Sequence, residues 1–488
     1  MYRPTIGLEI HVELKTKTKM FCSCLNNPDE KRPNFNVCPI CLGHPGTLPV
    51  INEEAVAKVI KTGLALNCQI PKYAKFDRKN YFYPDLPKGY QISQYDKPLC
   101  LEGYLEIPLD QDSSKKIRIK RIHLEEDTGS LSHLPEENCS LVNFNRAGVP
   151  LMELVTEPDM VSAKEARQFA EDFHLIMHYL DVSDADMEKG QMRVEVNISL
   201  SEQEGKLGTK AEIKNLNSFR AVEGAIEYEI KRQTEILESG GRILQETRGW
   251  DDMKGITISQ REKEEAHDYR YLPEPDLPGL SLSNEFIQGI KSKIPELPQN
   301  RKNRLIQEYS LNEKEAEIFV YYKDLGEYFE KVISELPSGL TQDNLLRLIK
   351  LTANYLISDL QGLLKGQLVT DKTFFITPEN FAEFITLIHE DKISSKIAKM
   401  VLLEMFKSGA DPSNIVEEQG LSQITDKSQI ENVVQEVVSQ NEKVVQEYLA
   451  GKETVLQFLV GQVMAKTKGR VNPQLAQEAL KEALTKIR

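Results

Sequence analysis

Four of the seven cysteines form two closely spaced pairs near the N-terminus, Cys22-x-Cys24 and Cys38-x-x-Cys41. Two thiolate pairs separated by a loop are typical of a tetrahedral zinc site with four cysteine ligands. The loop between the pairs contains two prolines and no apolar core of its own, so a bound metal would supply its order. Because four protein ligands leave no open coordination position, we expect a structural zinc ion. The alternative is four unrelated buried thiols.

Acidic and histidine side chains recur at alternate positions in two segments. Glu9, His11 and Glu13 alternate with apolar residues, and His123 and Glu125 repeat the pattern further along. In a strand such side chains point to one face. Carboxylates gathered there repel one another unless a cation compensates them, and Mg²⁺ is usually held by one or two carboxylates together with substrate phosphates. Spacing alone leaves open both a magnesium–phosphate site and ordinary ion pairing.

Glu153 has different surroundings. In the segment Leu151-Met152-Glu153-Leu154-Val155, apolar residues occupy both faces of the expected strand, and Glu153 shares a face with Leu151 and Val155. A carboxylate placed in such surroundings is either paired or bound to something, because burying an isolated charge is costly. Glu153 is therefore a further candidate for the group of acidic and histidine side chains that could bind a cation.

The segment 77–91, with the sequence DRKNYFYPDLPKGYQ, interleaves cations, aromatic residues and turn residues. Such a mixture can hold phosphates and stack on a base or a ribose. The alternative is a packed loop whose tyrosines belong to the core. The chain contains neither a G-x-x-x-x-G-K-[S/T] nor a G-x-G-x-x-G motif, so a nucleotide would not bind through a P-loop or a Rossmann turn.

These residues fall on elements that predict an α+β fold. The apolar residues of segment 6–14 share one face, and residues 192–200 repeat this alternation. Strands with one solvent-exposed face favour antiparallel pairing. The apolar phase slips between residues 117–119 and 122–124, which predicts a β-bulge. Ser218 is placed to cap a helix whose apolar stripe continues to residue 230.

The pattern predicts three domains. Residues 1–293 form a mixed or antiparallel β-sheet domain with helices and contain the cysteine loop 22–41. From about residue 294 the chain reads as successive amphipathic helices, for example 343–364, which predicts an all-α domain at 294–410. A break at Asp411-Pro412 introduces a small all-α tail domain at 411–488.

Composition limits the partners and the compartment. The net charge of −14 excludes an evenly basic nucleic-acid coat, so an RNA partner would be held by local basic patches such as residues 452–488. No run approaches the roughly 18 apolar residues of a membrane span, and the N-terminus leads directly into a patterned strand. We therefore expect a cytoplasmic protein with no membrane partner.

Together the motifs resemble the B-subunit family of the bacterial aspartyl/glutamyl-tRNA(Asn/Gln) amidotransferases, and the resemblance extends over essentially the whole chain. The N-terminal motifs are IGLEIHVEL at 6–14, the paired cysteines at 22–41, DRKNYFYPDLPKGYQISQ at 77–94 and RIHLEEDTGSL at 121–131. Further along the chain the motifs are FNRAGVPLMELVTEPD at 144–159, EIKNLNSF at 212–219, DYRYLPEPDLP at 268–278 and FLVGQVMAKTKGRVNP at 458–473.

The resemblance implies an ATP-dependent ligase with a catalytic "cradle" domain at 1–293. ATP would phosphorylate the side-chain carboxylate of the mischarged amino acid on Glu-tRNA(Gln) or Asp-tRNA(Asn), and ammonia would then displace the phosphate to give Gln-tRNA(Gln) or Asn-tRNA(Asn). The resemblance assigns Glu9, His11 and Glu125 to a magnesium and phosphoryl-transfer cluster, and places Glu153 and Glu157 in the same neighbourhood.

Further residues would contact the substrates. Lys79, Tyr81 and Arg146 are implied contacts to phosphate or to the aminoacyl end, and Asn215 and Asn217 are added to this group.

The resemblance also implies partner subunits. Because the chain contains no glutaminase or amidase signature, an amidase A subunit would hydrolyse glutamine and supply ammonia. A small C subunit would complete a heterotrimer. The tail domain of this chain would contact the tRNA. The alternative is a non-catalytic, zinc-stabilised tRNA-binding scaffold subunit of the same complex.

Overall fold

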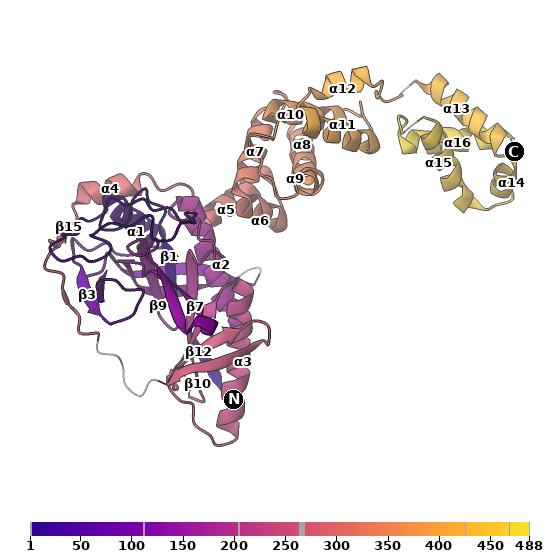
Figure 1. Ribbon diagram of the computed structural model, residues 1–488. Coiled ribbons are helices and arrows are strands. Elements are labelled where there is room, and N and C mark those ends of the chain that lie inside the picture. The colour runs from indigo at the N-terminus through magenta and orange to yellow at the C-terminus, as the bar shows by residue number, and fades with distance from the viewer. Residues whose placement is uncertain are drawn as a thin grey trace. The chain divides into compact units, whose positions relative to one another are not determined.

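The computed structural model describes residues 2–110, 113–203, 205–262, 269–424, 426–467 and 469–487 (Figure 1). The chain divides into two compact units, Met1–Pro298 and Gln299–Arg488. The first contains a mixed β-sheet with helices and the second is largely helical, which confirms the predicted α+β class. Three residues of the motifs and basic patch named above, Asp268, Lys468 and Arg488, lie outside the described residues.

The first unit is built on an eight-stranded sheet with the strand order β13-β12-β11-β10-β1-β9-β6-β5. Its strands are, in chain order, β1 (Arg3–Glu13), β5 (Cys100–Asp110), β6 (Ser113–Glu126), β9 (Pro150–Thr156), β10 (Met192–Ser201), β11 (Ala211–Leu216), β12 (Glu246–Asp251) and β13 (Ile256–Glu262). Neighbouring strands are antiparallel except for β11 and β12, which are parallel. The antiparallel pairing expected from the alternating strands is confirmed.

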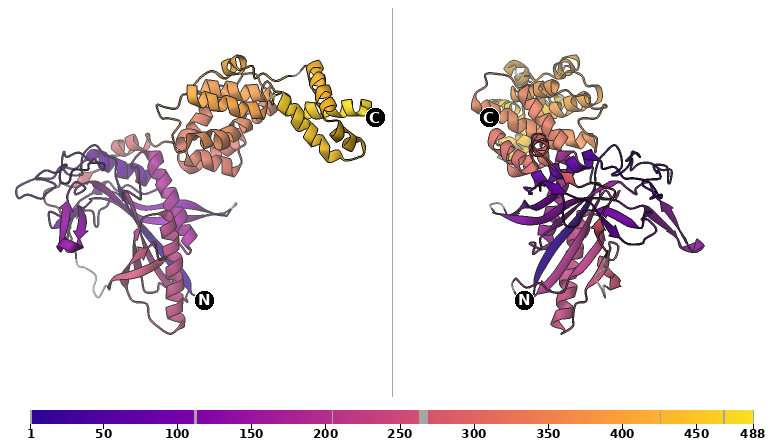
Figure 2. Two further views of the ribbon diagram at one scale, coloured as in Figure 1. Left: turned by 45° about the vertical axis from the view of Figure 1, so that its right-hand side comes forward. Right: turned by 90° about the vertical axis from the view of Figure 1, so that its left-hand side faces the viewer.

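One face of this sheet is the apolar core. The even-numbered residues of β1 from residue 6 onward, together with the following Leu14, are almost fully buried there, as the alternation predicts: Ile6, Leu8, Ile10, Val12 and Leu14. Three helices cover this face: α1 (Glu53–Ala65), α2 (Ala163–Leu180) and α3 (Phe219–Glu238). Helices α2 and α3 lie side by side (Figure 2), and Phe169 and Phe173 of α2 are fully buried in the core.

Polar side chains set where these helices begin. The hydroxyl of Ser218 accepts the backbone N–H of Ala221, which confirms the predicted cap of α3. Ser162 caps α2 through the N–H of Glu165 in the same way. Each cap satisfies a backbone donor that the first helical turn leaves unpaired.

Three small sheets surround the large one. Their strands are β14 (Leu272–Pro273), β3 (Asp77–Asn80) and β4 (Tyr90–Ser93) in the first, β15 (Leu280–Ser281) and β2 (Tyr73–Ala74) in the second, and β7 (Ser130–Leu134) and β8 (Cys139–Asn143) in the third. A 3-10 turn, η1 (Pro135–Glu137), joins β7 to β8, and α4 (Asn284–Lys291) follows β15.

The second unit consists of helices. They are α5 (Pro298–Tyr309), α6 (Glu313–Tyr321), α7 (Lys323–Ser334), α8 (Gln342–Asn354), η2 (Tyr355–Leu360), α9 (Gln361–Leu364), α10 (Pro378–His389), α11 (Ser395–Ser408), α12 (Pro412–Glu418), α13 (Lys427–Gln440), α14 (Glu442–Leu449), η3 (Glu453–Val455), α15 (Leu456–Lys466) and α16 (Pro473–Ile487). The helix expected over 343–364 is present, with a π-helical stretch, η2, between α8 and α9. None of the described helices is long and apolar enough to cross a membrane.

Candidate active site

The face of the large sheet opposite the core, here called the polar face, carries a row of ionisable side chains across four adjacent strands. His11 of β1 pairs with Arg193 of β10 on one side and with Glu153 of β9 on the other. Glu153 in turn pairs with His123 of β6. Direct cross-strand partners have Cβ atoms about 4.5–5.5 Å apart, so the register alone brings this row into contact.

The row is compact. Nε2 of His11 lies 3.3 Å from Oε2 of Glu153 and 3.9 Å from both Oε1 of Glu9 and Oε1 of Glu125. Nε2 of His123 lies 3.3 Å from Oε2 of Glu153 and 3.6 Å from Oε2 of Glu125. The structure therefore brings together Glu9, His11, Glu125 and Glu153, as the sequence predicts.

A β-bulge makes the contribution of β6 possible. The register between β6 and β9 shifts between Ile119 and Arg121, where the sequence predicts an irregularity. Ile117 and Ile119 face the core before the shift, and Ile122 and Leu124 face it afterwards. His123 and Glu125 consequently point to the polar face, where both are nearly fully buried.

Electrostatic coupling ties these groups together. Burial disfavours the imidazolium of His11, but its hydrogen bond to Glu153 and the charges of Glu153 and Glu125 raise the pKa of His11 to about 9. Burial also disfavours the imidazolium of His123, but the charges of Glu153 and Glu125 and hydrogen bonds to them raise the pKa of His123 to about 9. Burial and repulsion by Glu153 raise the pKa of Glu9 to about 7. The centre of the polar face thus stabilises added positive charge and disfavours the ionised form of Glu9.

These groups line a cavity of about 410 Å³ that also contains Lys79 and Tyr81. Lys79 belongs to β3, and its Nζ lies 5.9 Å from the ring centroid of Tyr81 and 5.1 Å from that of Tyr269. Burial opposes the charge of Lys79, but the carboxylates of Glu125 and Glu153 raise its pKa. Lys79 is therefore a half-buried cation placed beside two carboxylates.

A second polar group adjoins the row. Nη2 of Arg193 donates to Oδ2 of Asp127 at 2.7 Å, and Nε of Arg146 lies 3.6 Å from the same oxygen. Burial and the neighbouring Asp127 raise the pKa of Glu13 to about 8. Arg146 also donates to the backbone carbonyls of Thr128 and Gly129, at 3.1 and 2.8 Å. Among the described residues, Asp127 and Arg193 line the cavity. Within the described chain Arg146 is not part of this lining and contacts the cavity through Asp127.

Three predicted site residues lie elsewhere. Glu157 follows the end of β9 and lines a different cavity, together with Arg118 and Asp159. Asn215 and Asn217 are exposed, and among the described residues neither lines the cavity of the polar face. Their predicted roles in catalysis and in aminoacyl binding stay predictions.

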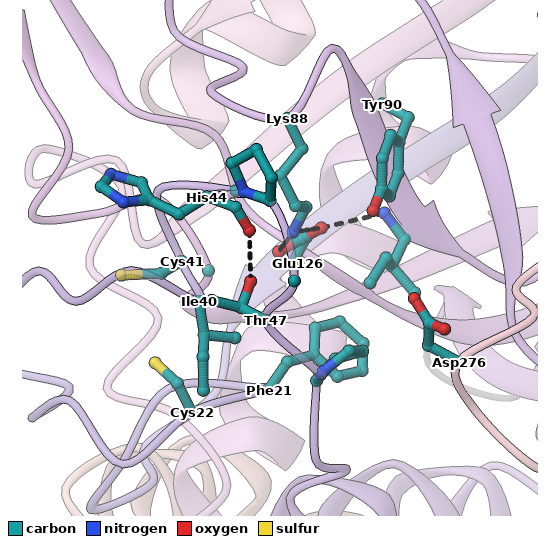
Figure 3. Close-up of a pocket in the computed structure, with 16 residues that line it drawn as sticks. Phe21, Cys22, Ile40, Cys41, His44, Thr47, Lys88, Tyr90, Glu126 and Asp276 are labelled. Carbon is teal, nitrogen blue, oxygen red and sulfur yellow. Dashed lines mark hydrogen bonds and ion pairs between the residues drawn. The ribbon is translucent and has the colours of Figure 1, made fainter.

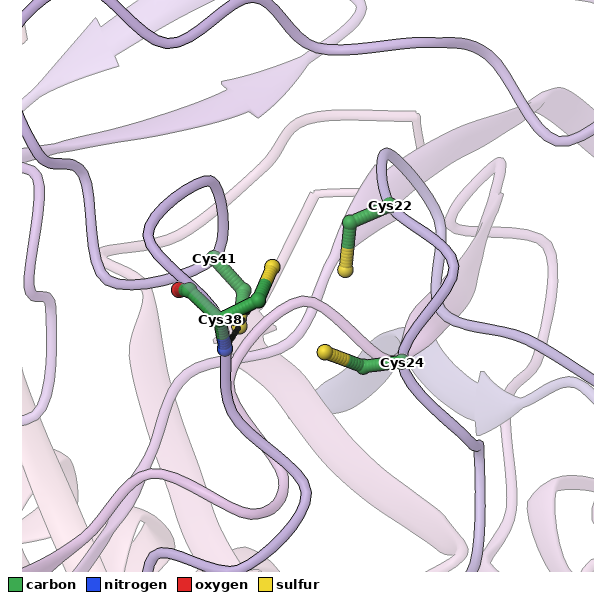
Figure 4. Close-up of side chains that lie close together, drawn as sticks. All are labelled: Cys22, Cys24, Cys38 and Cys41. Carbon is green, nitrogen blue, oxygen red and sulfur yellow. Dashed lines mark hydrogen bonds between the residues drawn. The ribbon is translucent and has the colours of Figure 1, made fainter.

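The paired cysteines converge as their spacing predicts. The sulfur atoms of Cys22, Cys24, Cys38 and Cys41 all lie within 4.8 Å of one another (Figure 4). Four sulfurs bound at about 2.3 Å to one tetrahedral ion would be roughly 3.8 Å apart. The cluster therefore fits a structural metal ion held by four thiolates.

Comparison with known proteins agrees with this geometry. A model of the GatB/GatE catalytic domain matches residues 4–288, and a model of the GatB domain matches residues 327–484. The chain belongs to the GatB/GatE family. Its first unit is thus a catalytic domain, which confirms the prediction of an enzyme.

Several relatives share one name, that of the B subunit of aspartyl/glutamyl-tRNA(Asn/Gln) amidotransferase. The protein of this name from Caldicellulosiruptor bescii is 50% identical over 100% of both chains. Those from Persephonella marina and Thermotoga maritima are 49% and 47% identical over 99% of both chains. The chain therefore corresponds to these GatB/GatE relatives over its whole length.

A second cavity of this GatB/GatE chain, of about 200 Å³, lies beside the cysteine cluster and is lined by Cys22 and Cys41 (Figure 3). Lys88 and Glu126 form a buried ion pair at this cavity. The backbone N–H of Ile92 donates to Oε1 of Glu126 at 3.0 Å. The pair connects the surroundings of the cysteine cluster to the strand that carries His123 and Glu125.

Two tyrosines of the main cavity were missed in the interpretation of the sequence. Tyr269 and Tyr271 lie just before β14, and the carbonyls of Tyr269 and Arg270 accept the backbone N–H and the Nδ2 group of Asn80 at 2.8 and 2.7 Å. No local spacing signals this contact, because about 190 residues separate its partners. Tyr271 also stacks on Tyr95, with ring centroids 4.3 Å apart.

Proposed function

We propose that this chain is the B subunit of a tRNA-dependent amidotransferase that converts mischarged Glu-tRNA(Gln) or Asp-tRNA(Asn) to the amide form at the expense of ATP. The observation that carries the proposal is the row Arg193–His11–Glu153–His123, which together with the buried Glu125 combines carboxylates and cations in a cavity of about 410 Å³. The family membership and the name shared by its relatives support the same reaction.

The reaction needs two steps. A side-chain carboxylate oxygen of the esterified Glu or Asp attacks the γ-phosphorus of ATP, and the bond from that phosphorus to the bridging oxygen breaks to release ADP. Ammonia then attacks the acyl carbon, inorganic phosphate leaves, and the nitrogen loses a proton to give the amide. Activation is required because a carboxylate at neutral pH resists attack by ammonia.

The residues of the cavity suit this chemistry by position and charge. Lys79 and Arg193 supply half-buried cations for phosphate oxygens, and such preorganised charges stabilise a phosphoryl-transfer transition state without covalent catalysis. Tyr81 and Tyr269 flank Lys79 and offer ring faces for a ribose or a base. No residue of the cavity is required to form a covalent intermediate.

The carboxylates fit a bound cation. Glu9, His11 and Glu153 bring one ligand atom each within 4.8 Å of one another, and so do His123, Glu125 and Glu153. We assign Glu9, Glu125 and His11 as candidate Mg²⁺ ligands, with Glu153 between the two groups. Magnesium bound there would offset negative charge on the carboxylates and on the phosphates of the substrate.

The four cysteines would hold Zn²⁺ as a structural ion, because thiolates favour zinc over magnesium and leave it no open position. We further propose that an amidase A subunit delivers ammonia, that a small C subunit completes the heterotrimer, and that residues 411–488 contact the tRNA. The subunit name of the relatives supports partner subunits and a tRNA substrate.

The test is amide formation on Glu-tRNA(Gln) with ATP, Mg²⁺ and ammonium chloride, because free ammonia bypasses the glutaminase. The assembled complex with Glu125→Gln is compared with wild type and with Glu227→Gln, a control on the exposed surface of α3. We expect Glu125→Gln to lose product formation while tRNA binding and the control remain unchanged. Undiminished product would contradict the proposal and favour the non-catalytic scaffold.

A further inference from the structure

Helix α2, which covers the core face of the large sheet, carries two histidines that lie next to each other. His174 and His178 are four residues apart in α2, so they lie one above the other on the same side of the helix. Their Nε2 atoms are 3.2 Å apart, and their ring centroids are 4.5 Å apart at an interplanar angle of 67°. The two Nε2 atoms are therefore close enough to share a hydrogen bond or a single bound ion.

This spacing matches that of two ligands on one metal ion. Imidazole nitrogens bind zinc at about 2.0–2.1 Å, so two of them on a tetrahedral ion are roughly 3.3 Å apart. A direct hydrogen bond between neutral imidazoles would give a similar separation, with one ring donating to the other. The distance fits both arrangements, and only the metal arrangement makes the pair a binding site.

The surroundings hold both rings in position. The ring of Phe219, at the start of α3, packs edge-on against His174 with centroids 5.4 Å apart. His174 is half-buried by this contact, whereas His178 is exposed. A metal ion can therefore reach the pair from solvent, while the inner ligand keeps one orientation.

Loss of solvent around the rings favours the neutral, metal-binding form of both histidines. Burial, together with repulsion from His178, lowers the pKa of His174 to about 4, and partial desolvation by neighbouring groups also lowers the pKa of the more exposed His178. Asp186 faces His174 and opposes this shift, as Asp184 does for His178. Lys15 acts in the other direction on His178 and is itself paired with Asp184 at 3.1 Å. Neutral imidazole binds transition metals and imidazolium does not.

We propose that His174 and His178 form a bidentate site for a divalent transition-metal ion of the Zn²⁺, Ni²⁺ and Cu²⁺ class, with water in the remaining positions. Imidazole nitrogen suits these ions, whereas Mg²⁺ is held mainly by carboxylates and phosphates, so this two-histidine pair differs in ligand set from the carboxylate-rich cavity. A bound ion would bridge the last two turns of α2 and stabilise this end of the helix, which packs on the core.

The probe is Cu²⁺–nitrilotriacetate, a chelate with free positions for two imidazoles, added to the zinc-loaded full chain. We expect electron paramagnetic resonance to show one chelate bound through two imidazole nitrogens. His174→Gln and His178→Gln should each weaken binding by about 100-fold, since the second ligand then no longer acts intramolecularly. His389→Gln, at the end of α10 in the other unit, is the matched control.

The folded state of each variant is checked by the emission of Trp250, the only tryptophan, which lies in the first unit. His178 is exposed, so its variant keeps the test meaningful if His174→Gln disturbs the core. As a second readout, Zn²⁺ should raise the melting temperature of this unit in wild type and not in the variants. Equal copper binding by wild type and both variants, or a signal from a single imidazole, would overturn the proposal and leave only a hydrogen-bonded pair.

Discussion

Nε2 of His11 lies 3.3 Å from Oε2 of Glu153, and the two residues are direct cross-strand partners on β1 and β9. His123 approaches the same oxygen from the other side, also at 3.3 Å. One carboxylate thus contacts two imidazoles. Despite burial, these imidazoles lower the pKa of Glu153, and the charge of Glu153 in turn helps to raise the pKa of Lys79. Glu153 is therefore the central residue of the polar face.

Glu153→Gln should abolish this coupling while preserving the size of the side chain. We expect the kcat of amide formation with ammonium chloride to fall by roughly 100- to 1000-fold, the range typical for the loss of one preorganised electrostatic contact. tRNA binding should change little. The measurement is single-turnover amide formation by the assembled complex, with binding measured separately.

Glu157→Gln is the control for this prediction, because Glu157 lines a different cavity. An equal loss of activity in both variants would mean that proximity to the row does not decide the effect. It would also support the catalytic role that the resemblance implies for Glu157.

The face and the bulge of the site could be predicted because both depend on local periodicity. Alternation in β1 places Glu9 and His11 on the polar face, and the phase slip in β6 places Glu125 there too. Glu157, which the resemblance and not the alternation suggests, falls outside this reasoning. It lies one residue beyond the end of β9, where its backbone N–H donates to the carbonyl of Arg118 and the alternation no longer applies.

Residues that reach the cavity through contacts between distant segments of the chain could not be predicted from local periodicity. Arg193 has the right alternation on β10, but no pattern within a strand states that β10 lies next to β1. Tyr269 and Tyr271 line the cavity from a segment in which the carbonyls of Tyr269 and Arg270 accept hydrogen bonds from Asn80. The π-helical stretch η2 is likewise a backbone detail that helical periodicity does not specify.

The cysteine cluster makes a prediction about metal content. Cys38→Ser should remove zinc from the chain and lower the melting temperature of the first unit, because structural zinc contributes binding free energy directly to folding, about 10–16 kcal/mol in small zinc domains. Zinc is measured by elemental analysis and unfolding by the emission of Trp250. Cys139→Ser, at an exposed free cysteine, should keep zinc and stability. Retention of zinc by Cys38→Ser would contradict the assignment.

A buried lysine accompanies the thiolates. Lys19 is fully buried, and its Nζ lies 3.9 Å from Sγ of Cys41 and 3.3 Å from the carbonyl oxygen of Phe144. Four thiolates around one zinc ion leave a net charge of −2, which Lys19 partly offsets. We expect Lys19→Met to speed the release of zinc to a chromogenic chelator by about 10- to 100-fold, the usual effect of removing a group that supports a metal site. Lys97→Met, on the exposed surface, is the control, and equal release rates would assign Lys19 to packing alone.

The depressed pKa of His174 predicts a dependence of stability on pH. The pKa is about 4 in the folded chain against an ordinary 6.5, so between these values the unfolded chain binds a proton that the folded chain does not. The free energy of unfolding should therefore fall as the pH drops from about 6.5 to 4, and His174→Gln should make this fall shallower. Urea unfolding followed by Trp250, without added transition metal, measures it at each pH. Titrating groups that do not interact with His174 are common to both proteins and cancel in the difference. His389→Gln should run parallel to wild type, and a His174→Gln curve that also runs parallel would show that His174 titrates alike in both states.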